Sequence, residues 1–296
     1  MVTSEELASL RRLHGLAFAK MNGSGNDFIL IDNRAAGLEP GLLPLLARGL
    51  CARGRSAGAD GLIILEPSDR VDDSRGRVDF RWHFFNADGS SAEMCGNGGR
   101  CAARYALDQG LAGRRMVFDT LAGPIGAQVE GSTVKLEMVP PRGAYSHLEL
   151  DAPGGPVTLH GVNTGVPHAV VPVADLEAAP VREVGRHLRY HQHFAPAGTN
   201  VNFMRAQDGE LWVRTYERGV EDETLACGTG AVASALVAGS LGWLKPPVSV
   251  RVRSGETLRV HFSAEGHNFR EVFLEGAASY VYEARLHQEA FDWLAF

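Results

Sequence analysis

A Cys-Gly-x-Gly sequence occurs twice in this chain, each time at the start of a segment with the composition of a helix. Residues 93–99 read E-M-C-G-N-G-G and precede R-C-A-A-R-Y-A-L; residues 225–231 read L-A-C-G-T-G-A and precede V-A-S-A-L-V-A-G. Each half also has an Asn-bearing turn before an expected strand, at 23–28 and at 198–203. The duplication predicts two similar domains, each containing one of these helices.

Short apolar segments with strand character make up much of the remaining sequence. In residues 78–84, V-D-F-R-W-H-F, apolar and polar side chains alternate, as in a half-buried strand. Further strands are expected at 28–31, 62–65, 133–138, 248–253 and 272–274, and helices at 41–53, 97–110, 181–191 and 229–241. Strands grouped around isolated helices favour an α+β fold. The Pro/Gly-rich residues 139–144 are expected to link the two domains.

Composition limits the function classes. The 296 residues, 45% hydrophobic and 22% charged, are ordinary for a soluble globular protein with room for two medium domains. A net charge of -6 argues against a nucleic-acid or anionic-membrane surface, because both need a basic face. The longest apolar stretch, 231–244, is too short to span a bilayer, and the N-terminus lacks the apolar region of a secretory signal. We expect a cytoplasmic protein in which residues 1–15 form an extension.

The four cysteines do not have the spacing of a metal site. None forms a C-x-x-C pair or has a histidine at zinc-finger distance, so no metal is expected. A structural disulfide is not expected in a reducing compartment. Cys51 and Cys101 are interpreted as small buried hydrophobic residues.

The other two cysteines, Cys95 and Cys227, stand where a helix is expected to begin. A helix N-terminus exposes unpaired N–H groups and positive potential, which stabilise a thiolate and lower the pKa of a thiol. The glycines that follow allow close approach and leave N–H groups for an anion. A single such site is equally well explained as an anion-binding loop with an incidental cysteine.

Two such thiols acting on opposite faces of one carbon can invert its configuration. One, as thiolate, removes a proton and the other, as thiol, returns one, which requires different protonation states. Helix N-termini would stabilise the developing negative charge. Pyridoxal phosphate could do the same, but it requires a Schiff-base lysine, and Lys20, Lys135 and Lys245 lack a suitable sequence context. A mechanism without a cofactor is therefore favoured.

Other polar residues suit a small zwitterionic substrate. Arg218 can grip a carboxylate, and Glu217 can hold an ammonium group or tune a thiol. Glu221, Asp222 and Glu223 are interpreted as a solvated charged loop.

Two further residues have a structural interpretation beside a functional one. Asn86 follows a strand in the turn sequence N-A-D-G, which by itself explains an asparagine. His168 could be a core histidine, or it could serve the pair of thiols.

Several motifs resemble the diaminopimelate epimerase family. They are G-S-G-N-D-F, G-A-D-G-L-I, F-N-A-D-G-S-S-A-E-M-C-G-N-G-G-R-C, N-T-G-V-P-H, T-N-V-N-F and Y-E-R-G-V-E-D-E-T-L-A-C-G-T-G-A, and they run from about residue 16 to near the C-terminus. The resemblance implies an isomerase that interconverts LL- and meso-2,6-diaminoheptanedioate without pyridoxal phosphate, in lysine and peptidoglycan-precursor synthesis. It also implies two similar domains, each with strands around a central helix, and an active site in the cleft between them.

The resemblance also assigns roles by motif. Cys95 and Cys227 match the family's base and acid, with His168 and Glu217 as polarising neighbours. The ligand-binding side chains would be Asn26, Asn86, Asn200, Glu217 and Arg218, and the carboxylate cradle would be Gly96, Asn97, Gly228 and Thr229.

Two positions depart from the family pattern. Gly61 stands where many members have Gln, and Val166 stands where many have Asn. Asn163 is the candidate substitute for that amide. Both departures concern recognition of the distal end of the substrate.

The family also implies a homodimer and a last strand that returns to the first domain. We therefore expect one domain to contain residues 16–138 and 276–296, and the other to contain 139–275. Alternatives are a proline or hydroxyproline racemase, a non-catalytic anion- or nucleotide-binding protein, and a thiol oxidoreductase. The binder is disfavoured because the chain has no G-K-[ST] P-loop.

Overall fold

The computed structural model describes residues 2–266 and 268–295, which form two compact units. Unit 1 is Met1–Val134 with Ala277–Phe296, and unit 2 is Lys135–Gly276. The first division falls inside a strand, between Val134 and Lys135, and the second falls near the end of another. Part of the expected linker, 142–144, belongs to a strand of unit 2.

Among its described residues, unit 1 contains three α-helices, two 3-10 segments and strands from the first half and the C-terminal end of the chain. Its elements are α1 (Ser4–Arg11), β1 (Ala17–Gly23), β2 (Asn26–Asp32), η1 (Pro40–Leu42), α2 (Leu43–Cys51), β3 (Gly61–Pro67), β4 (Val71–Asp72), β5 (Gly76–Arg77), β6 (Phe80–Asn86), α3 (Gly96–Asp108), β7 (Arg115–Thr120), β8 (Gly123–Glu130), β19 (Ser279–Arg285) and η3 (Gln288–Ala295). Strand β9 (Thr133–Glu137) leads from unit 1 into unit 2.

Unit 2 is built from the continuous middle of the chain. Its elements are β10 (Arg142–Leu150), β11 (Val157–Asn163), β12 (Pro167–Pro172), α4 (Val181–Arg189), η2 (Gln192–Phe194), β13 (Asn200–Gln207), β14 (Glu210–Glu217), β15 (Asp222–Thr224), α5 (Gly228–Ser240), β16 (Val248–Arg251), β17 (Thr257–Glu265) and β18 (Asn268–Ala277). All helices and strands expected from the sequence are present, with ends shifted by a few residues.

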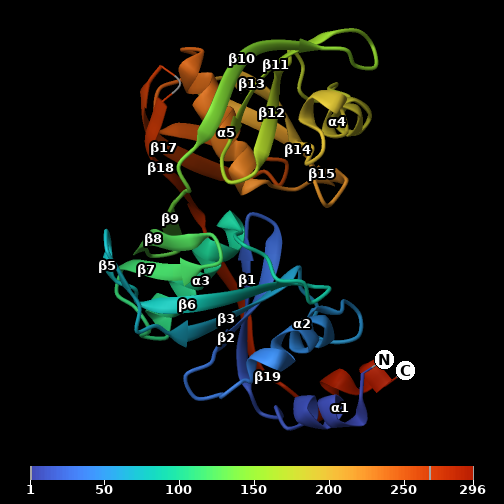
Figure 1. Cartoon of the computed structure of the whole chain (residues 1–296), viewed down its shortest axis with the longest axis vertical. Helices are drawn as coiled ribbons and strands as arrows, with labels where there is room; N and C mark the ends of the chain where they lie inside the picture. Colours follow the sequence, from blue (N-terminus) through green and yellow to red (C-terminus); the bar gives the residue numbers. More distant parts are fainter. Residues whose placement is uncertain (1, 267, 296) are drawn as a thin grey trace. The chain divides into compact units, whose positions relative to one another are not determined.

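The two units repeat one topology (Figure 1). In unit 1, β1–β2 is antiparallel, β2–β3 parallel, β3–β6 antiparallel, β6–β7 parallel and β7–β8 antiparallel. The series β11–β12–β13–β14–β16–β17 in unit 2 has the same order of directions. In each unit a short helix (α2 or α4) lies in the first parallel crossover and a longer one (α3 or α5) in the second. The predicted α+β fold with two similar domains is confirmed.

This topology corrects one correspondence inferred from the sequence. The Asn-bearing turns at 23–28 and 198–203 are not equivalent, because Asn26 begins β2 and Asn200 begins β13. The counterpart of β13 is β3, so the residue in the place of Asn200 is Gly61. By the same register, the counterpart of Glu217 at the end of β14 is Asn86 at the end of β6.

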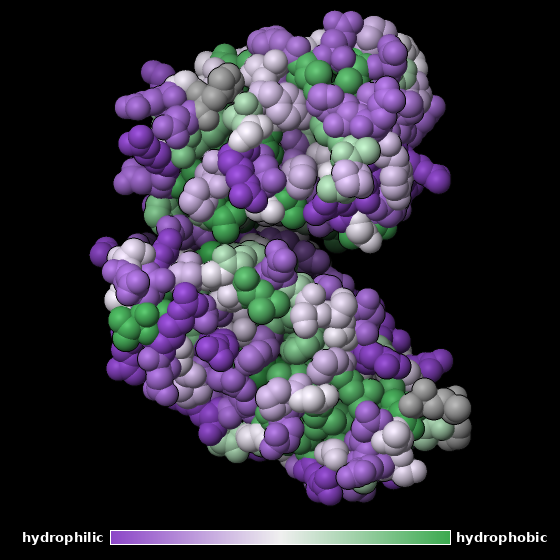
Figure 2. Space-filling model, in the orientation of Figure 1, coloured by the Kyte–Doolittle hydropathy of each residue, from purple (hydrophilic) through white to green (hydrophobic). Residues whose placement is uncertain are grey.

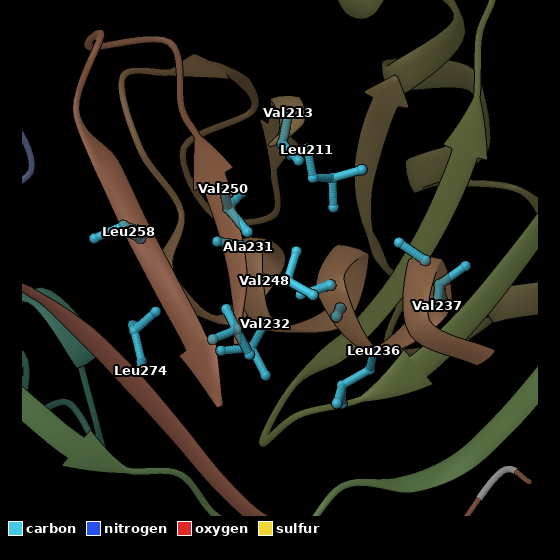
Figure 3. Close-up of a cluster of buried hydrophobic side chains, with 14 of the residues drawn as sticks. Leu211, Val213, Ala231, Val232, Leu236, Val237, Val248, Val250, Leu258 and Leu274 are labelled. Carbon is cyan, nitrogen blue, oxygen red and sulfur yellow. The ribbon is translucent and has the colours of Figure 1, made fainter. Parts of the chain in front are cut away.

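Strand alternation in unit 2 separates two cores. Val170, Met204 and Val213 pack with α5, whereas their neighbours Val171 and Phe203 pack with α4. Figure 3 shows the first core, in which side chains of α5 meet those of β14, β16, β17 and β18. Each fully buried Val or Leu side chain there contributes about 1.5–3 kcal/mol.

Helix α5 is the centre of this core. All residues from Gly230 to Ala238 are buried, so the helix is covered on every side. In unit 1, the first half of α3 is buried in the same way. There Ile29 and Ile64 pack with α2, while Phe28 and Ile63 lie against Gly98 of α3.

The N-terminal extension is part of unit 1. Thr3 and Glu6 form a reciprocal cap on α1, Leu10 is fully buried, and Arg11 pairs with Asp292 of η3. Figure 2 shows hydrophobic side chains gathered near α2 and η3, where partly buried residues such as Trp293 pack on the core. None of the helices among residues 2–266 and 268–295 combines the length and apolarity needed to cross a lipid bilayer.

A substitution at Gly61 tests why this chain lacks a side chain there. An added Cβ would lie 2.7 Å from the Phe84 ring and 2.8 Å from the Phe85 carbonyl oxygen. We expect Gly61→Ala to lower the free energy of unfolding by about 1–3 kcal/mol because the backbone of β6 cannot move aside. Urea denaturation measures this. Gly41→Ala is the control, since nothing lies within 4 Å of its added Cβ; equal losses in both variants would contradict the packing explanation.

Candidate active site

Cys95 is the N-cap residue of α3, as predicted. Its backbone is extended (φ -143°, ψ 116°), and Sγ accepts a hydrogen bond from Gly98 N at 3.4 Å. The first helical hydrogen bond runs from Gly99 N to Cys95 O at 2.7 Å, so the N–H groups of Gly96 and Asn97 precede it. The half-buried thiol therefore lies in the positive potential of the helix N-terminus, beside two amides suited to an anion.

A chain of hydrogen bonds fixes the amides beside this thiol. The fully buried Arg100 donates to Asn97 Oδ1 (3.0 Å) and to Ser24 Oγ (2.7 Å). Asn97 Nδ2 donates to Asn26 Oδ1 (2.7 Å), and Asn26 Nδ2 donates to Asp60 Oδ2 (2.9 Å). Each of these two amides accepts one bond at Oδ1 and donates one from Nδ2, so each keeps a second Nδ2 hydrogen beyond the bonds of this chain.

Beyond Asp60 lies an ion-pair cluster that the sequence did not indicate. Arg53 binds Asp27 and Asp60, and the buried Lys20 binds Asp27 at 2.9 Å. Burial alone would raise the pKa of the Asp27 carboxyl, but hydrogen bonds from Arg53 and Lys20 outweigh it and lower that pKa to about 2. Arg53 contacts Asp60 Oδ1, which leaves Asp60 Oδ2 as the acceptor for Asn26.

Asn86 lies at the same edge of the sheet. It is the exposed last residue of β6 and pairs across the strands with Gly61. Its Nδ2 donates to Ser90 Oγ at 3.0 Å, and its main-chain N–H donates to Ser90 O. The turn role expected from N-A-D-G is therefore confirmed.

Cys227 is the N-cap residue of α5, in the place that Cys95 has in unit 1. Its backbone is extended (φ -116°, ψ 108°), and the residue is 7% exposed. Sγ lies 3.5 Å from Thr229 Oγ1, and the first helical hydrogen bond runs from Ala231 N to Cys227 O at 2.9 Å. Thr164 Oγ1, in the loop between β11 and β12, donates to Thr229 O at 3.1 Å and connects that loop to the start of α5.

His168 is buried near this helix start. The residue is 2% exposed, Nδ1 lies 3.0 Å from Asn202 Nδ2, and Nε2 is buried without a hydrogen-bond partner. Burial, followed by the positive charge of Arg218, lowers the pKa of the imidazole from 6.5 to about 3, against a smaller opposite effect of the Asn202 hydrogen bond. His168 is therefore a neutral donor or acceptor near neutral pH.

Glu217, Asn200 and Arg218 meet at the end of β14. Burial raises the pKa of the Glu217 carboxyl, and the Thr224 hydroxyl opposes that shift in part. Asn200 Oδ1 accepts from Arg218 N at 2.8 Å, and Asn200 Nδ2 donates to Pro167 O at 3.2 Å. Arg218 Nη1 donates to Ala197 O at 3.2 Å. Within the described part of the chain, no carboxylate lies within 4.0 Å of the Arg218 guanidinium, which can thus receive an anionic ligand.

The interpretation of 221–223 as a solvated loop is wrong. Asp222 and Glu223 lie in β15, where Asp222 pairs with Arg182 and Glu223 pairs with Arg214 at 2.7 Å. Glu221 pairs with Arg189 at 3.0 Å. These carboxylates hold the segment before Cys227 in place.

The loop with Val166 and Asn163 uses its amide internally. Asn163 Oδ1 accepts from Gly165 N at 2.9 Å, and Thr164 N donates to Val166 O. If Asn163 takes the place of the amide that Val166 lacks, only its Nδ2 group is therefore left to contact a ligand.

The remaining cysteines are buried, as predicted. Cys101 lies inside α3 with no exposed surface, and burial raises the pKa of the Cys51 thiol to about 12. Among residues 2–266 and 268–295, no three His, Cys, Asp or Glu side chains are grouped in a way that could hold a metal ion.

Each unit thus gathers its own set of predicted site residues. Unit 1 brings together Cys95, Gly96, Asn97 and Asn26, with Asn86 at the same edge. Unit 2 contains Cys227, Gly228, Thr229, His168, Asn200, Glu217 and Arg218. Sequence reasoning missed Asn202 and Thr215. The alternation of a strand could have indicated Asn202, because it lies two residues after Asn200 and on the same face of β13.

The pKa of His168 predicts how stability depends on pH. Between pH 6.5 and about 3, the unfolded chain binds a proton at this histidine that the folded chain rejects. The free energy of unfolding is therefore unaffected by this histidine above pH 6.5. Below pH 6.5 it decreases as the pH falls, and the decrease is ~2 kcal/mol at about pH 5. Urea denaturation should show this loss in the wild type and in an exposed control, His193→Gln, but not in His168→Gln. A loss of equal size in His168→Gln would contradict the assignment.

Solved structures share the fold at low sequence identity. A phenazine biosynthesis protein of the PhzF family from Bacillus anthracis matches with a TM-score of 0.70 and 14% identity, covering 92% of this chain and 98% of that one. A hydroxyproline epimerase from Agrobacterium vitis matches with a TM-score of 0.66 and 18% identity, covering 93% of each chain. These matches support the two-domain α+β architecture.

Sequence relatives are closer. The family model for diaminopimelate epimerase matches residues 18–143 and 161–281. The diaminopimelate epimerase of Aquifex aeolicus is 46% identical over 288 residues, covering 94% of this chain and 100% of the relative. That of a Hydrogenobaculum species is 42% identical over 287 residues, covering 93% and 100%. The chain, with its two cysteine-capped helices, therefore belongs to the diaminopimelate epimerase family.

Proposed function

We propose that this protein interconverts LL- and meso-2,6-diaminoheptanedioate, with Cys95 and Cys227 as the two acid–base groups. The observation that carries the proposal is that both thiols cap glycine-rich helix starts at equivalent places in a repeated topology. The names of the relatives give the substrate. The enzyme is an isomerase that uses only its own side chains and backbone, in lysine and peptidoglycan-precursor synthesis.

The chemistry follows from the helix starts. One thiolate removes the α-proton while the opposite thiol donates a proton to the other face, and the roles exchange in the reverse direction. The N–H groups of Gly96 and Asn97, and of Gly228 and Thr229, bind the substrate carboxylate. They also stabilise the negative charge that develops as the Cα–H bond breaks. The mechanism requires both sulfurs to reach one carbon.

The two thiols have different surroundings, which the mechanism needs. Cys227 shares its unit with the neutral His168 and with Glu217, whose carboxyl has a raised pKa. Cys95 has the amide chain from Arg100 to Asn26 instead. Different neighbours allow one sulfur to be thiolate while the other is thiol.

The remaining polar side chains bind the two amino-acid ends. Arg218 forms a bidentate contact with a carboxylate, and Glu217 accepts an ammonium group. Asn26, Asn86 and Asn200 supply further hydrogen bonds. At the distal end, Gly61 and Val166 contribute no side-chain amide.

Domain roles, assembly and location complete the proposal. The expected domains 16–138 with 276–296, and 139–275, are the two catalytic halves, preceded by the extension 1–15. The protein acts as a cytoplasmic homodimer and takes a small diamino dicarboxylic acid, without nucleic acid, membrane, metal or cofactor as partner.

Deuterium exchange at the substrate α-carbon tests the reaction. Incubation with LL-diaminopimelate in D₂O should exchange one α-hydrogen and form the meso isomer. Cys95→Ser and Cys227→Ser should each lose about 10²–10⁴-fold in exchange rate, because each removes one acid–base group. Cys51→Ala is the control thiol, since it is buried outside the site. Exchange of proline or hydroxyproline alone would disprove the substrate, and full activity of both serine variants would disprove the mechanism.

Arg218 is expected to contribute to substrate binding. Arg218→Ala removes a charge-assisted bidentate contact, and KM for LL-diaminopimelate should rise about 10- to 100-fold. Steady-state kinetics measures this, with the exposed Arg186→Ala on α4 as control. An unchanged KM in Arg218→Ala would remove this residue from the binding set.

A further inference from the structure

The repeated topology allows the residues beneath the two cysteine-capped helices to be compared one by one. In unit 1, Phe28 lies beside Gly61 at the parallel β2–β3 pair, and Ile63 lies opposite Phe84. Added atoms on Gly98, in the first turn of α3, would meet Ile63 Cδ1 at 3.1 Å and the Phe28 ring at 3.5 Å. The Phe28 and Phe84 rings pack edge to face, 6.0 Å apart. The side chains of Phe28, Ile63 and Phe84 beneath the first turn of the Cys95 helix are therefore apolar.

The equivalent places in unit 2 are polar. His168 lies beside Asn200 at the parallel β12–β13 pair, and Asn202 lies opposite Thr215. An added Cβ on Gly230, the counterpart of Gly98, would lie 2.2 Å from Asn202 Oδ1 and 3.3 Å from Cys227 Cβ. The set His168, Asn202 and Thr215 thus replaces Phe28, Ile63 and Phe84 directly beneath the first turn of the Cys227 helix.

These three side chains are buried and hydrogen-bonded to one another. Their exposures are 2%, 0% and 4% for His168, Asn202 and Thr215. Thr215 Oγ1 donates to Asn202 Oδ1 at 2.9 Å, and Asn202 Nδ2 lies 3.2 Å from Ala169 O and 3.0 Å from His168 Nδ1. Burying polar side chains is costly unless all their hydrogen bonds are made. A purely structural role would therefore favour apolar side chains at these three positions, as in unit 1.

The bonding pattern fixes the protons. Ala169 O is a carbonyl and can only accept, so the Asn202 atom that faces it must be the NH₂ group. The same NH₂ group then donates its second hydrogen to His168 Nδ1, which must carry no proton. In a neutral imidazole the proton is therefore on Nε2.

The Nε2–H group is buried and has no partner in the described residues. Two observations set His168 beside the start of the Cys227 helix. The Asn202 amide contacts Gly230 in the first turn after Cys227, and the charge of Arg218 is close enough to affect the imidazole. An unsatisfied buried donor is destabilising, so its retention indicates a ligand that accepts its hydrogen bond.

We propose that Asn202 and Thr215 are positioning residues that hold His168 as the Nε2–H tautomer, so that it is a fixed donor to negative charge in the site. The charge is that of the thiolate or of the substrate carbon as it loses its proton. In this tautomer Nε2 cannot accept a proton from a thiol, so His168 polarises by donating. The catalytic consequence rests on the proposed epimerase function, whereas the tautomer itself does not.

The tautomer is measured without turnover. In the full-length protein labelled with ¹⁵N-histidine, at about pH 7, the His168 signals should show a protonated Nε2 and an unprotonated Nδ1. In Asn202→Asp the carboxylate accepts from the ring, so Nδ1 should become protonated. Ser234→Ala is the control, since it removes another buried hydroxyl hydrogen bond in α5 and should leave both signals unchanged. A protonated Nδ1 in the wild type, or an unprotonated Nδ1 in Asn202→Asp, would overturn the proposal.

Exchange kinetics test the donor role separately. His168→Gln retains an N–H donor but no base, and His168→Leu retains neither; circular dichroism verifies that both are folded. The glutamine variant should exchange α-hydrogen at least about 10-fold faster than the leucine variant, with similar KM values. Equal rates would overturn the donor role. If the tautomer signals behave as expected but the wild type does not exchange diaminopimelate, the proposed function fails and the positioning role stands.

Discussion

Each unit is built around a helix whose first-turn N–H groups must stay available to a ligand while the rest of the helix is buried. Residues Gly230 to Ala238 of α5 are covered on all sides, which makes the helix position rigid. The N–H groups of the first turn cannot be satisfied within the helix, and the cysteine cap leaves them directed at the site. Glycine at the third helical position is needed most clearly in α5, because a Cβ on Gly230 would lie 2.2 Å from Asn202 Oδ1, whereas a Cβ on Gly98 of α3 would meet Ile63 Cδ1 at 3.1 Å.

Much of this could be predicted from the sequence because it is local. The extended Cys95 and Cys227 and the helices after them follow from spacing and glycine content, and 78–84 shows its strand by alternation. Pairing of strands is not local. Asn26 and Asn200 stand in similar sequence contexts, yet they begin non-equivalent strands. Similarity between two short sequences is thus a weaker guide to structurally equivalent positions in the two units than the order of parallel and antiparallel strand pairs.

The polar network around the site was also beyond the sequence, for the same reason. Asn202 meets Thr215 only through the β13–β14 register, and Asn26 meets Asp60 only because α2 returns the chain beside β2. Charged residues before Cys227 looked solvated because their partners, Arg182, Arg189 and Arg214, lie elsewhere in the chain. A sequence pattern shows that a residue is polar, but it does not show whether the fold brings an ion-pair or hydrogen-bond partner to it.

The return of the chain to unit 1 has a consequence for its synthesis. Strand β19 pairs with β1 along its length, and Arg100 and Arg104 of α3 hold the carbonyl groups of Ala277 and Ala278. Residues 135–276 of unit 2, by contrast, are continuous. As the chain leaves the ribosome, β1 and α3 emerge first but lack these partners until the end. The unit that is begun first is therefore completed last, and the unit that contains Cys227 is assembled before the unit that contains Cys95.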